Sequence, residues 1–254
     1  MGEPSALVLA AGKGTRMRSP LPKPLVPVAG RAIVLRLLDA LAEAGVTDRV
    51  LVVGHGAEQV MAAVGDRARF ALQTEQRGMA HAVACAREAM GDCEEIYVFV
   101  GDTALLRAAS IRTLRDGHRA SGAAVSFLTS DFPVRLPYAR VIRGQRGEVS
   151  AVIEERDAPS GALALREYMS SHYLFRADGL WPYLERVKPH PVTGELYLTD
   201  VLGMVLAEGR LVNAVSIPDW RELVGPNTPE EVSWAEGVLA GEDPPFPELA
   251  VEPA

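Results

Sequence analysis

The sequence predicts an α/β protein built on one mainly parallel sheet that helices cover on both faces. Short apolar runs alternate with segments whose apolar residues recur at helical spacing, and this alternation is typical of parallel strands joined by helical crossovers. The 254 residues are 48% hydrophobic and 23% charged, which is ordinary for a globular protein with a sizeable core.

The first half of the chain supports this fold class element by element. Its apolar runs predict strands, and the segments between them predict helices. The clearest helix follows Arg31, because Leu37, Leu38 and Leu41 fall on one face and Gly45 ends the pattern. The predicted strands are 6–10, 49–54, 68–73, 95–102 and 123–129, and the predicted helices are 31–44, 58–64, 79–90 and 109–119.

The second half of the chain has a less regular alternation. Segments 138–144 and 148–155 flank Gly144–Gly147, which predicts a hairpin. We expect one domain at 1–240, followed by an irregular, proline-rich tail at 241–254. The other predicted elements are strands at 167–175 and 211–217 and helices at 180–187, 199–208 and 230–240.

Composition argues against several classes of partner. The formal net charge of −7 argues against nonspecific binding to nucleic acid or to an anionic membrane. No apolar run approaches the roughly 20 residues that span a bilayer, and the amino-terminal stretch lacks the basic start of a signal peptide. Cys85 and Cys93 form no Cys-x-x-Cys pair, and two scattered thiols favour a reducing compartment, the cytoplasm.

The loop after the first predicted strand is positive, although the protein is acidic. It reads LAAGKGTRM at 9–17, and no Asp or Glu occurs at 4–38. The chain has only three lysines, and two of them, Lys13 and Lys23, lie in this region. A compact ammonium acts as a point charge on phosphate oxygens. The loop therefore predicts a site for an anionic ligand.

Glycines and prolines shape this loop. Gly12 and Gly14 let main-chain N–H groups approach a ligand closely. Pro22 and Pro24 bracket Lys23, and a residue before proline favours an extended conformation. We therefore expect an extended loop that wraps a polyphosphate, and the alternative is a flexible, solvated basic loop. The P-loop pattern and the dinucleotide fingerprint are both absent.

Asp102 is a candidate metal ligand. It follows Gly101 at the end of a very apolar predicted strand, and open α/β sheets bind ligands at the carboxyl ends of their strands. A carboxylate there suits Mg²⁺, which takes one or two protein oxygens and completes its shell with phosphates and water. The alternative is that Asp102 caps the following turn.

Six segments, in order along the chain, resemble the sugar-phosphate nucleotidylyltransferases. The likeness is to the uridylyltransferase domain of bifunctional N-acetylglucosamine-1-phosphate uridylyltransferase/glucosamine-1-phosphate acetyltransferase, without its left-handed β-helix domain, and it covers most of residues 5–230. Because the chain stops before such a domain, no acetyltransferase activity is expected. The segments are LAAGKGTRM with LPKPLVPVAG, QTEQRGMAHAV (73–83), VGDTALL (100–106), YARVIRG with VIEERDA (138–158), GELYLTDVL (194–202) and VGPN (224–227).

The resemblance implies a three-layer α/β/α, Rossmann-like nucleotide-diphospho-sugar transferase fold with a mainly parallel mixed sheet. Within it, about 1–130 would form a nucleotide-binding half and about 131–227 a sugar-binding half, with a C-terminal helix at about 228–240.

The resemblance also implies which residues hold the nucleotide and the metal. Arg16 and Lys23 would contact the phosphates and carry catalysis, while Asp102 and Asn227 would hold Mg²⁺. Asn227 could instead be a turn residue before an N-cap at Thr228. The nucleotide-binding residues would be Leu9, Ala10, Gly12, Gly14, Gln73 and Gly78, of which the last two would read the uracil edge. Taken alone, Gln73 would be a surface residue at a strand end.

On the sugar side, the sequence departs from the family pattern. Glu154 would bind sugar hydroxyls, the alternative being a solvated strand carboxylate, and Thr199 could equally be an N-cap. The family's Tyr-Gly-Arg reads Tyr-Ala-Arg here, and its Glu-Ile-Asn-Thr-Gly reads EYMSS at 167–171. We therefore expect an altered acceptor. The sugar-binding residues would be Ala139, Glu154, Met169, Tyr197 and Thr199.

The function that this resemblance implies is transfer of UMP from UTP to a sugar 1-phosphate, with release of pyrophosphate. The sugar would be N-acetylglucosamine 1-phosphate or a related one. Met79 replaces a family hydroxyl near the base, so cytidylyl or thymidylyl transfer to another phosphorylated acceptor is the first alternative. The second is a non-catalytic homologue that binds nucleotide sugars.

Overall fold

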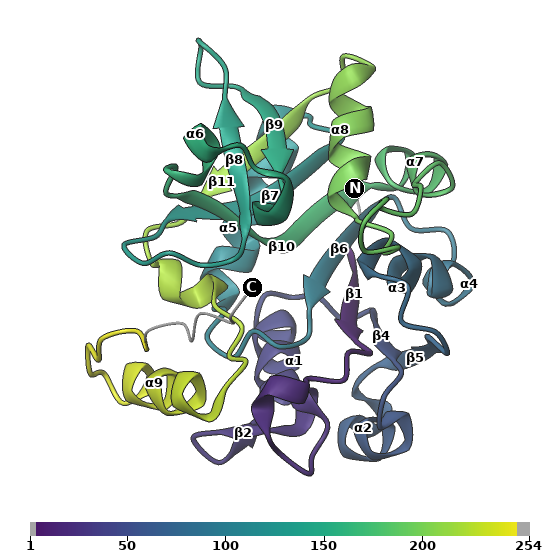
Figure 1. The fold of residues 1–254 in the computed structure, drawn as a ribbon. Helices are drawn as coiled ribbons and strands as arrows, with labels where there is room; N and C mark the ends of the chain where they lie inside the picture. The colour runs from purple at the N-terminus through teal and green to yellow at the C-terminus, as the bar shows by residue number, and fades with distance from the viewer. Residues whose placement is uncertain (1–3, 248–254) are drawn as a thin grey trace.

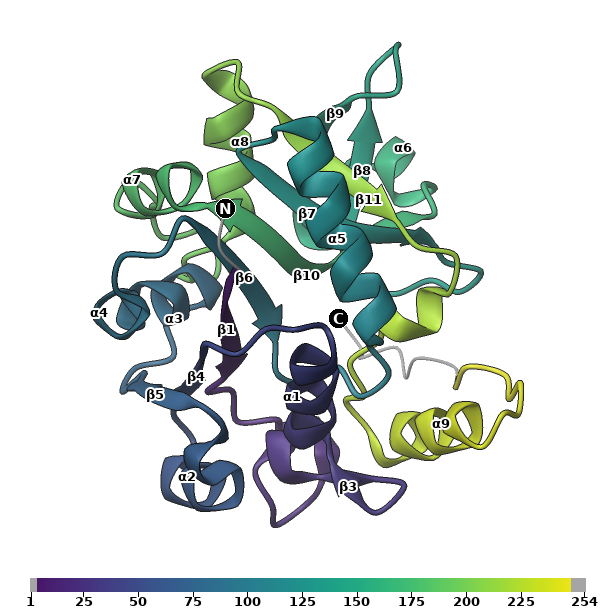
Figure 2. The ribbon, with the colours of Figure 1, turned by 180° about the vertical axis from the view of Figure 1, so that it is seen from behind.

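The structure, a computed structural model, describes residues 4–247 (Figures 1 and 2). One nine-stranded mixed sheet runs through these residues, and a small two-stranded sheet lies beside it. The strands of the large sheet are β1 (Ser5–Ala10), β4 (Arg49–Val53), β5 (Arg69–Leu72), β6 (Glu95–Val100), β7 (Val125–Asp131), β8 (Ala139–Arg143), β9 (Val149–Ile153), β10 (Glu167–Arg176) and β11 (Val212–Ser216).

The order of the main path is β11-β7-β10-β6-β1-β4-β5, and the β8–β9 hairpin joins it through β10. β5, β4, β1 and β6 run parallel, as do β7 and β11. β10 is antiparallel to both β6 and β7 and so joins the two parallel parts. The predicted mainly parallel mixed sheet is confirmed.

Helices cover both faces of the sheet, because alternate residues of each buried strand pack on opposite sides. On one face, the side chains of Val8 and Phe99 pack with α1 and α5, which lie in front in Figure 2. On the other face, Leu7 and Val98 pack with α3 and α8. The helices are α1 (Ile33–Glu43), α2 (Ala57–Val64), α3 (Met79–Cys85), α4 (Arg87–Met90), α5 (Ala108–Ser121), α6 (Ser160–Leu163), α7 (Trp181–Leu184), α8 (Thr199–Ala207) and α9 (Pro229–Leu239).

Four local predictions differ from the structure. Lys23 is not extended but begins a 3-10 turn, in which the Leu25 N–H bonds the Pro22 carbonyl; Pro24 fits there because it has no N–H to satisfy. The helix predicted from Arg31 starts later, because Arg31–Ala32 pairs with Pro27–Val28 as the hairpin β3–β2. The segments predicted as helices at 79–90 and 180–187 hold shorter ones, the first divided into α3 and α4.

The part of the tail that the structure describes packs back onto the domain. Residues 242–247 have neither helix nor strand. The ring of Phe246 packs edge-on against Trp234, at 4.9 Å between centroids, and the Trp234 indole donates a hydrogen bond to the Pro244 carbonyl. The predictions for 1–3 and 248–254 lie outside the described residues. Within 4–247, no helix is both long and apolar enough to cross a membrane.

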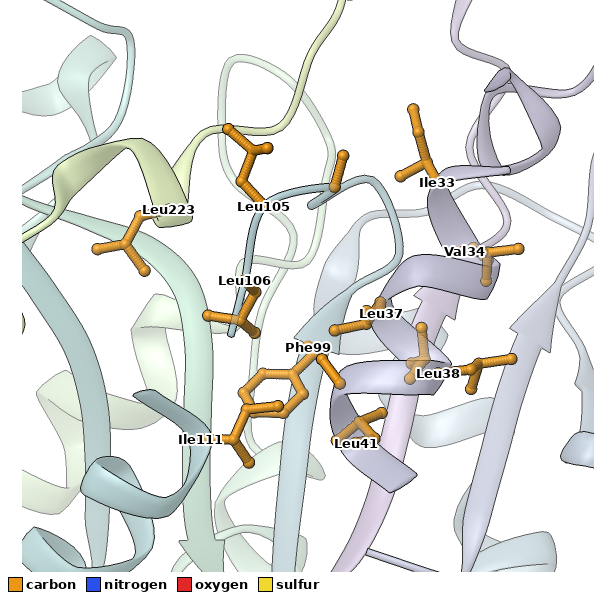
Figure 3. Packing of buried hydrophobic residues seen from close by; sticks show 14 of the residues in the cluster. Ile33, Val34, Leu37, Leu38, Leu41, Phe99, Leu105, Leu106, Ile111 and Leu223 are labelled. Carbon is orange, nitrogen blue, oxygen red and sulfur yellow. The ribbon is translucent and has the colours of Figure 1, made fainter. Parts of the chain in front are cut away.

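The core between α1, β6 and α5 is the first feature that a mutation can test (Figure 3). Leu37 is 1% exposed among Phe99 and Ile111, so Leu37→Ala is expected to lower the free energy of unfolding by about 2–5 kcal/mol. Val192, which is 79% exposed, provides the matched control. Val192→Ala should change the free energy of unfolding by less than about 0.5 kcal/mol. Urea unfolding measures both; similar values for the two variants would contradict this core.

Candidate active site

The predicted phosphate and metal residues meet in one cavity at the carboxyl ends of β1 and β6. This cavity, called the loop cavity below, has a volume of about 310 Å³. The loop after β1 and the residues after β6 both line it. Eight predicted site residues line it: Leu9, Ala10, Gly12, Gly14, Arg16, Lys23, Asp102 and Asn227.

The Lys23 ammonium joins three segments of the loop cavity. Its Nζ donates to Asp102 Oδ2 at 2.5 Å and to Asn227 Oδ1 at 2.7 Å. The Lys23 side chain is only 12% exposed, so its charge is largely shielded from water. The side chain of Asp102 is therefore hydrogen-bonded to Lys23, a contact that is absent from the alternative in which Asp102 caps the following turn.

The electrostatic state of Asp102 follows from this pair. Burial alone would raise the pKa of Asp102, but the Lys23 ammonium more than offsets it, with a smaller contribution from His172. The resulting pKa lies below its ordinary value, so Asp102 is a carboxylate at neutral pH. The charged oxygen of Asp102 and the amide oxygen of Asn227 thus face one position, which the Lys23 ammonium occupies.

These two oxygens fit the requirements of Mg²⁺. Both contact a single ammonium nitrogen, which shows that they can face one cation. Among residues 4–247, no group of three or more His, Cys, Asp or Glu side chains could hold a metal. Mg²⁺ needs no such group, because it is commonly bound through one or two protein oxygens together with substrate phosphates and water.

Close backbone approach explains two glycines around this cavity. Gly14 has φ 59°, and a Cβ there would lie 2.4 Å from Lys23 Cβ. A Cβ on Gly225 would lie 2.7 Å from Asp102 Oδ1. Any larger residue would therefore push Lys23 or Asp102 out of position. The side chain of Arg16, which is exposed, reaches the same cavity.

The two residues predicted to read the base lie apart from the loop cavity. Gln73 is 4% exposed, so the surface alternative for it is wrong. Its amide Nε2 lies 3.3 Å from the Gly78 carbonyl oxygen and 3.1 Å from His81 Nδ1. Gly78 has φ 102° and packs against the Leu196 backbone, which joins this segment to the GELYLTD motif.

The predicted sugar-binding residues line two further cavities, called together the acceptor cavity. Gly78, predicted to read the base, lines the larger of the two as well. The volumes of the two cavities are about 220 and 480 Å³, and Pro137, Glu154 and Ser171 line both. Asp102 lines the smaller one as well as the loop cavity. Ala139 and Met169 line the smaller part, and Tyr197 and Thr199 line the larger part.

Glu154 is the acidic group that both parts of the acceptor cavity share. Its Oε1 accepts a hydrogen bond of 2.9 Å from the Thr199 hydroxyl. Burial raises the pKa of Glu154, and the Thr199 hydrogen bond partly offsets this. Thr199 is the first residue of α8 and not its N-cap, which is Leu198. Thr228, in contrast, is the N-cap of α9, as the sequence suggested.

Several residues that complete the site are ones for which the sequence predicts no role. Glu231 accepts a hydrogen bond of 2.6 Å from the Asn227 backbone, and the Tyr138 hydroxyl accepts one of 3.3 Å from the Gly225 backbone. Phe246 of the tail lines the acceptor cavity. Ser171 has φ 64°, a conformation that favours glycine. Two of them left a signal: Ser171, where the family pattern has glycine, and Tyr138, the tyrosine of the Tyr-Ala-Arg motif.

The ion pair predicts a change in titration. Lys23→Met should raise the pKa of Asp102 above its ordinary value of 3.8, because burial then acts without the ammonium. In the wild type, the ionised Asp102 stabilises the fold at pH values above the pKa that this carboxyl has in the unfolded chain. This stabilisation is lost as the pH falls through the lower pKa that Asp102 has in the folded protein. Carbon-detected NMR of the carboxyl measures this pKa. Lys188→Met, an exposed control, should leave it unchanged; an unchanged pKa in Lys23→Met would contradict the pair.

Burial of Glu154 predicts that this carboxylate lowers stability. Because folding raises its pKa, the contribution of Glu154 is fully present below the ordinary pKa of 4.5 and is lost as the pH rises through the folded pKa. Glu154→Gln keeps an oxygen for Thr199 and should therefore be more stable than the wild type at neutral pH, with the gain vanishing below pH 4.5. Urea unfolding at both pH values measures this, and a loss at neutral pH would refute it.

Comparisons with known proteins identify the family of this chain. The model of the MobA-like NTP transferase domain matches residues 6–195. The bifunctional protein GlmU of Heliobacterium modesticaldum is 41% identical over 240 residues, which cover 94% of this chain and 52% of that protein. GlmU of Exiguobacterium sibiricum is 39% identical over 232 residues, with 91% and 52% covered. The chain thus spans about half the length of the curated relatives it matches.

Solved structures with the same fold are less similar in sequence. One is a Bacillus anthracis protein solved with sucrose, whose assignment as a glucose-1-phosphate thymidylyltransferase is unproven. It has a TM-score of 0.77 at 18% identity, and the match covers 97% of this chain and 98% of that one. A UDP-glucose pyrophosphorylase solved with UDP-glucose has a TM-score of 0.72 at 17% identity, covering 94% and 98%. The three-layer nucleotidyltransferase fold is confirmed, and the chain belongs to the MobA-like NTP transferase domain family as a relative of the GlmU proteins.

Proposed function

We propose that this chain transfers UMP from UTP to a sugar 1-phosphate and releases pyrophosphate. The observation that carries the proposal is the loop cavity, where Lys23, Asp102 and Asn227 converge beside the glycine-rich loop after β1. A second cavity, lined by the half-buried carboxylate of Glu154, adjoins it, and Asp102 and Asn227 line both. Two ligands could therefore bind on either side of one metal-binding position.

The relatives support the same class of reaction. The curated relatives are bifunctional GlmU proteins, of which this chain matches about half. The structural neighbours are described as a thymidylyltransferase of glucose 1-phosphate and as a pyrophosphorylase bound to UDP-glucose. The names of the two structural neighbours both concern nucleotide sugars or their formation. Together with the GlmU relatives, they support a sugar-1-phosphate nucleotidyltransferase.

The proposed chemistry needs positioning and charge more than proton transfer. A phosphate oxygen of the sugar 1-phosphate attacks the α-phosphorus of UTP in line, and the bond to pyrophosphate breaks. The nucleophile is already anionic at neutral pH, so no general base is required. Arg16 and Lys23 would bind the phosphates and stabilise the charge that develops on them.

Asp102 and Asn227 would hold Mg²⁺, which would supply further charge neutralisation on the phosphates. In that arrangement the Asp102 carboxylate, kept ionised by its depressed pKa, is ready to bind a cation without first losing a proton. Gly225 and Glu231 keep Asn227 turned toward Asp102, because the Asn227 Nδ2 donates to the Gly225 carbonyl at 2.8 Å and the Asn227 backbone N–H donates to Glu231.

The acceptor is proposed to be a sugar 1-phosphate whose hydroxyls bind Glu154. Tyr197 and Thr199 would line its other side. Met169 is 1% exposed and Ala139 3%, so the wall that they form offers apolar contact where the family pattern has an amide and a glycine. This wall favours a related sugar over N-acetylglucosamine 1-phosphate itself, because a thioether cannot replace the two donors of an amide.

The first experiment measures pyrophosphate release with Mg²⁺, four nucleoside triphosphates (UTP, CTP, dTTP and GTP) and a panel of sugar 1-phosphates. Release with UTP alone is expected. Release with CTP or dTTP instead would favour the first alternative, which rests on Met79 beside Gly78 at the base-reading segment. Binding without release in every combination would show a non-catalytic homologue.

Charge removal tests the assignment of the site. Arg16→Ala and Lys23→Ala should each lower the rate by about 10²–10³-fold, as expected when one preorganised charge contact is lost, and Asp102→Ala should abolish turnover. Lys188 is the matched control, because it is the third lysine of the chain, exposed and outside both cavities. Near-normal rates in Lys23→Ala and Asp102→Ala would refute the assignment.

A further inference from the structure

Strand β10 contains an irregularity where it passes the carboxyl end of β6. Its Met169 pairs with Thr129 of β7 and its Tyr173 with Phe127, so four steps along β10 match two along β7. The extra residues form a bulge, in which Ser171 adopts φ 64°. Such bulges re-aim side chains next to functional sites.

The bulge carries a chain of buried hydrogen bonds. Ser170 Oγ lies 3.0 Å from His172 Nδ1, and His172 Nε2 lies 2.9 Å from Thr103 Oγ1. Ser170 is 6% exposed, and His172 and Thr103 are fully buried. Both ring nitrogens of His172 therefore have a partner inside the protein.

The imidazole of His172 is neutral at neutral pH. Burial lowers the pKa of His172 to about 4, while Asp102 and a hydrogen bond to the Ser170 backbone act in the opposite direction. A neutral imidazole donates through one ring nitrogen and accepts through the other. The Ser170 and Thr103 hydroxyls can each donate or accept, so both ring nitrogens are satisfied in either tautomer.

The two ends of this chain reach two different parts of the site. Thr103 follows Asp102 directly, in the turn after β6. Ser170 and Ser171 line the acceptor cavity. Besides its contact with the long side chain of Lys23, Asp102 is therefore held through its neighbour Thr103. The same buried network, through His172, also holds Ser170 in the wall of the acceptor cavity.

We propose that His172 is a positioning residue that fixes the Asp102 turn through Thr103 and the acceptor-cavity wall through Ser170. This inference rests on the proposed function. In that function, His172 contacts neither the nucleotide nor the sugar 1-phosphate. Residues that orient a metal ligand from behind typically change metal affinity or activity by 10–100-fold when they are replaced, and a displacement of about 1 Å can cost 100-fold in rate.

Asparagine and glutamine separate the two contacts of His172. The terminal amide of Asn reaches the place of Nδ1, and the amide of Gln reaches that of Nε2. His172→Gln should keep the bond to Thr103 and lose Ser170; His172→Asn should do the reverse. Ser170→Ala and Thr103→Val remove the same contacts from the other ends, and they provide the test if a His172 variant fails to fold.

The measurements are the Mg²⁺ concentration at half-maximal pyrophosphate release and the KM of the panel's best sugar 1-phosphate. The rise in Tm when Mg²⁺ is added to protein with UTP provides a readout without turnover. His172→Asn and Thr103→Val should raise the Mg²⁺ requirement about 10-fold or more and diminish this rise in Tm. His172→Gln and Ser170→Ala should keep both near wild type and raise the acceptor KM.

His118 is the matched control for a buried histidine. It is 2% exposed, its Nδ1 lies 2.8 Å from Ser126 Oγ, and it faces Glu95 at the opposite end of β6. His118→Asn and His118→Gln should lower Tm in proportion to lost packing but leave the Mg²⁺ requirement and the acceptor KM unchanged.

Two results would overturn the inference. One is an unchanged Mg²⁺ requirement in His172→Asn and Thr103→Val, with only Tm lowered, which would make the network purely structural. The other is an equal effect of the Asn and Gln variants on both parameters. A wild type that releases no pyrophosphate with any substrate pair would instead refute the proposed function, and the rise in Tm with Mg²⁺ and UTP would still decide the role of His172.

Discussion

The double contact of the Lys23 ammonium is the interaction on which the site depends. It joins segments that lie 79 and 204 residues away along the chain, at Asp102 and Asn227. A carboxylate placed at the end of a buried strand would be costly without a partner. With Lys23 beside it, Asp102 stays ionised, and the glycine-rich loop, the β6 turn and the segment before α9 are held around one cavity.

The sheet explains why a second cavity adjoins the first. β6 lies between the parallel β1 and the antiparallel β10. Because β10 runs in the opposite direction, its early residues arrive at the carboxyl end of β6, where the loop after β1 also lies. Met169, Ser170 and Ser171 therefore form a wall beside Asp102. One edge of the sheet thus offers places for two ligands, which a transfer reaction requires.

Much of the fold and the site could be predicted from the sequence, for physical reasons that differ between residues. The strands and the α1 face follow from apolar periodicity, and the Lys23–Asp102–Asn227 set follows from the family motifs. The Ser170–His172–Thr103 network could not be predicted, because it depends on a register shift in β10 that no local pattern marks. The contact of Phe246 with Trp234 likewise depends on the path of an irregular tail. The 3-10 turn at Lys23 depends on main-chain hydrogen bonds, whereas the preference of a residue before proline for an extended conformation considers only local steric clashes.

On the acceptor side, Ala139, Met169 and Ser171 replace the family residues. The predicted phosphate and metal residues keep the family pattern; they are Arg16, Lys23, Asp102 and Asn227. This contrast supports the proposed transfer centre with an altered acceptor. The most direct test is a crystal structure with UTP and Mg²⁺. The triphosphate should lie along residues 12–16, with Mg²⁺ against Asp102 and Asn227 and the Lys23 ammonium on a phosphate. A nucleotide bound elsewhere, with the loop cavity free of phosphate, would contradict the account.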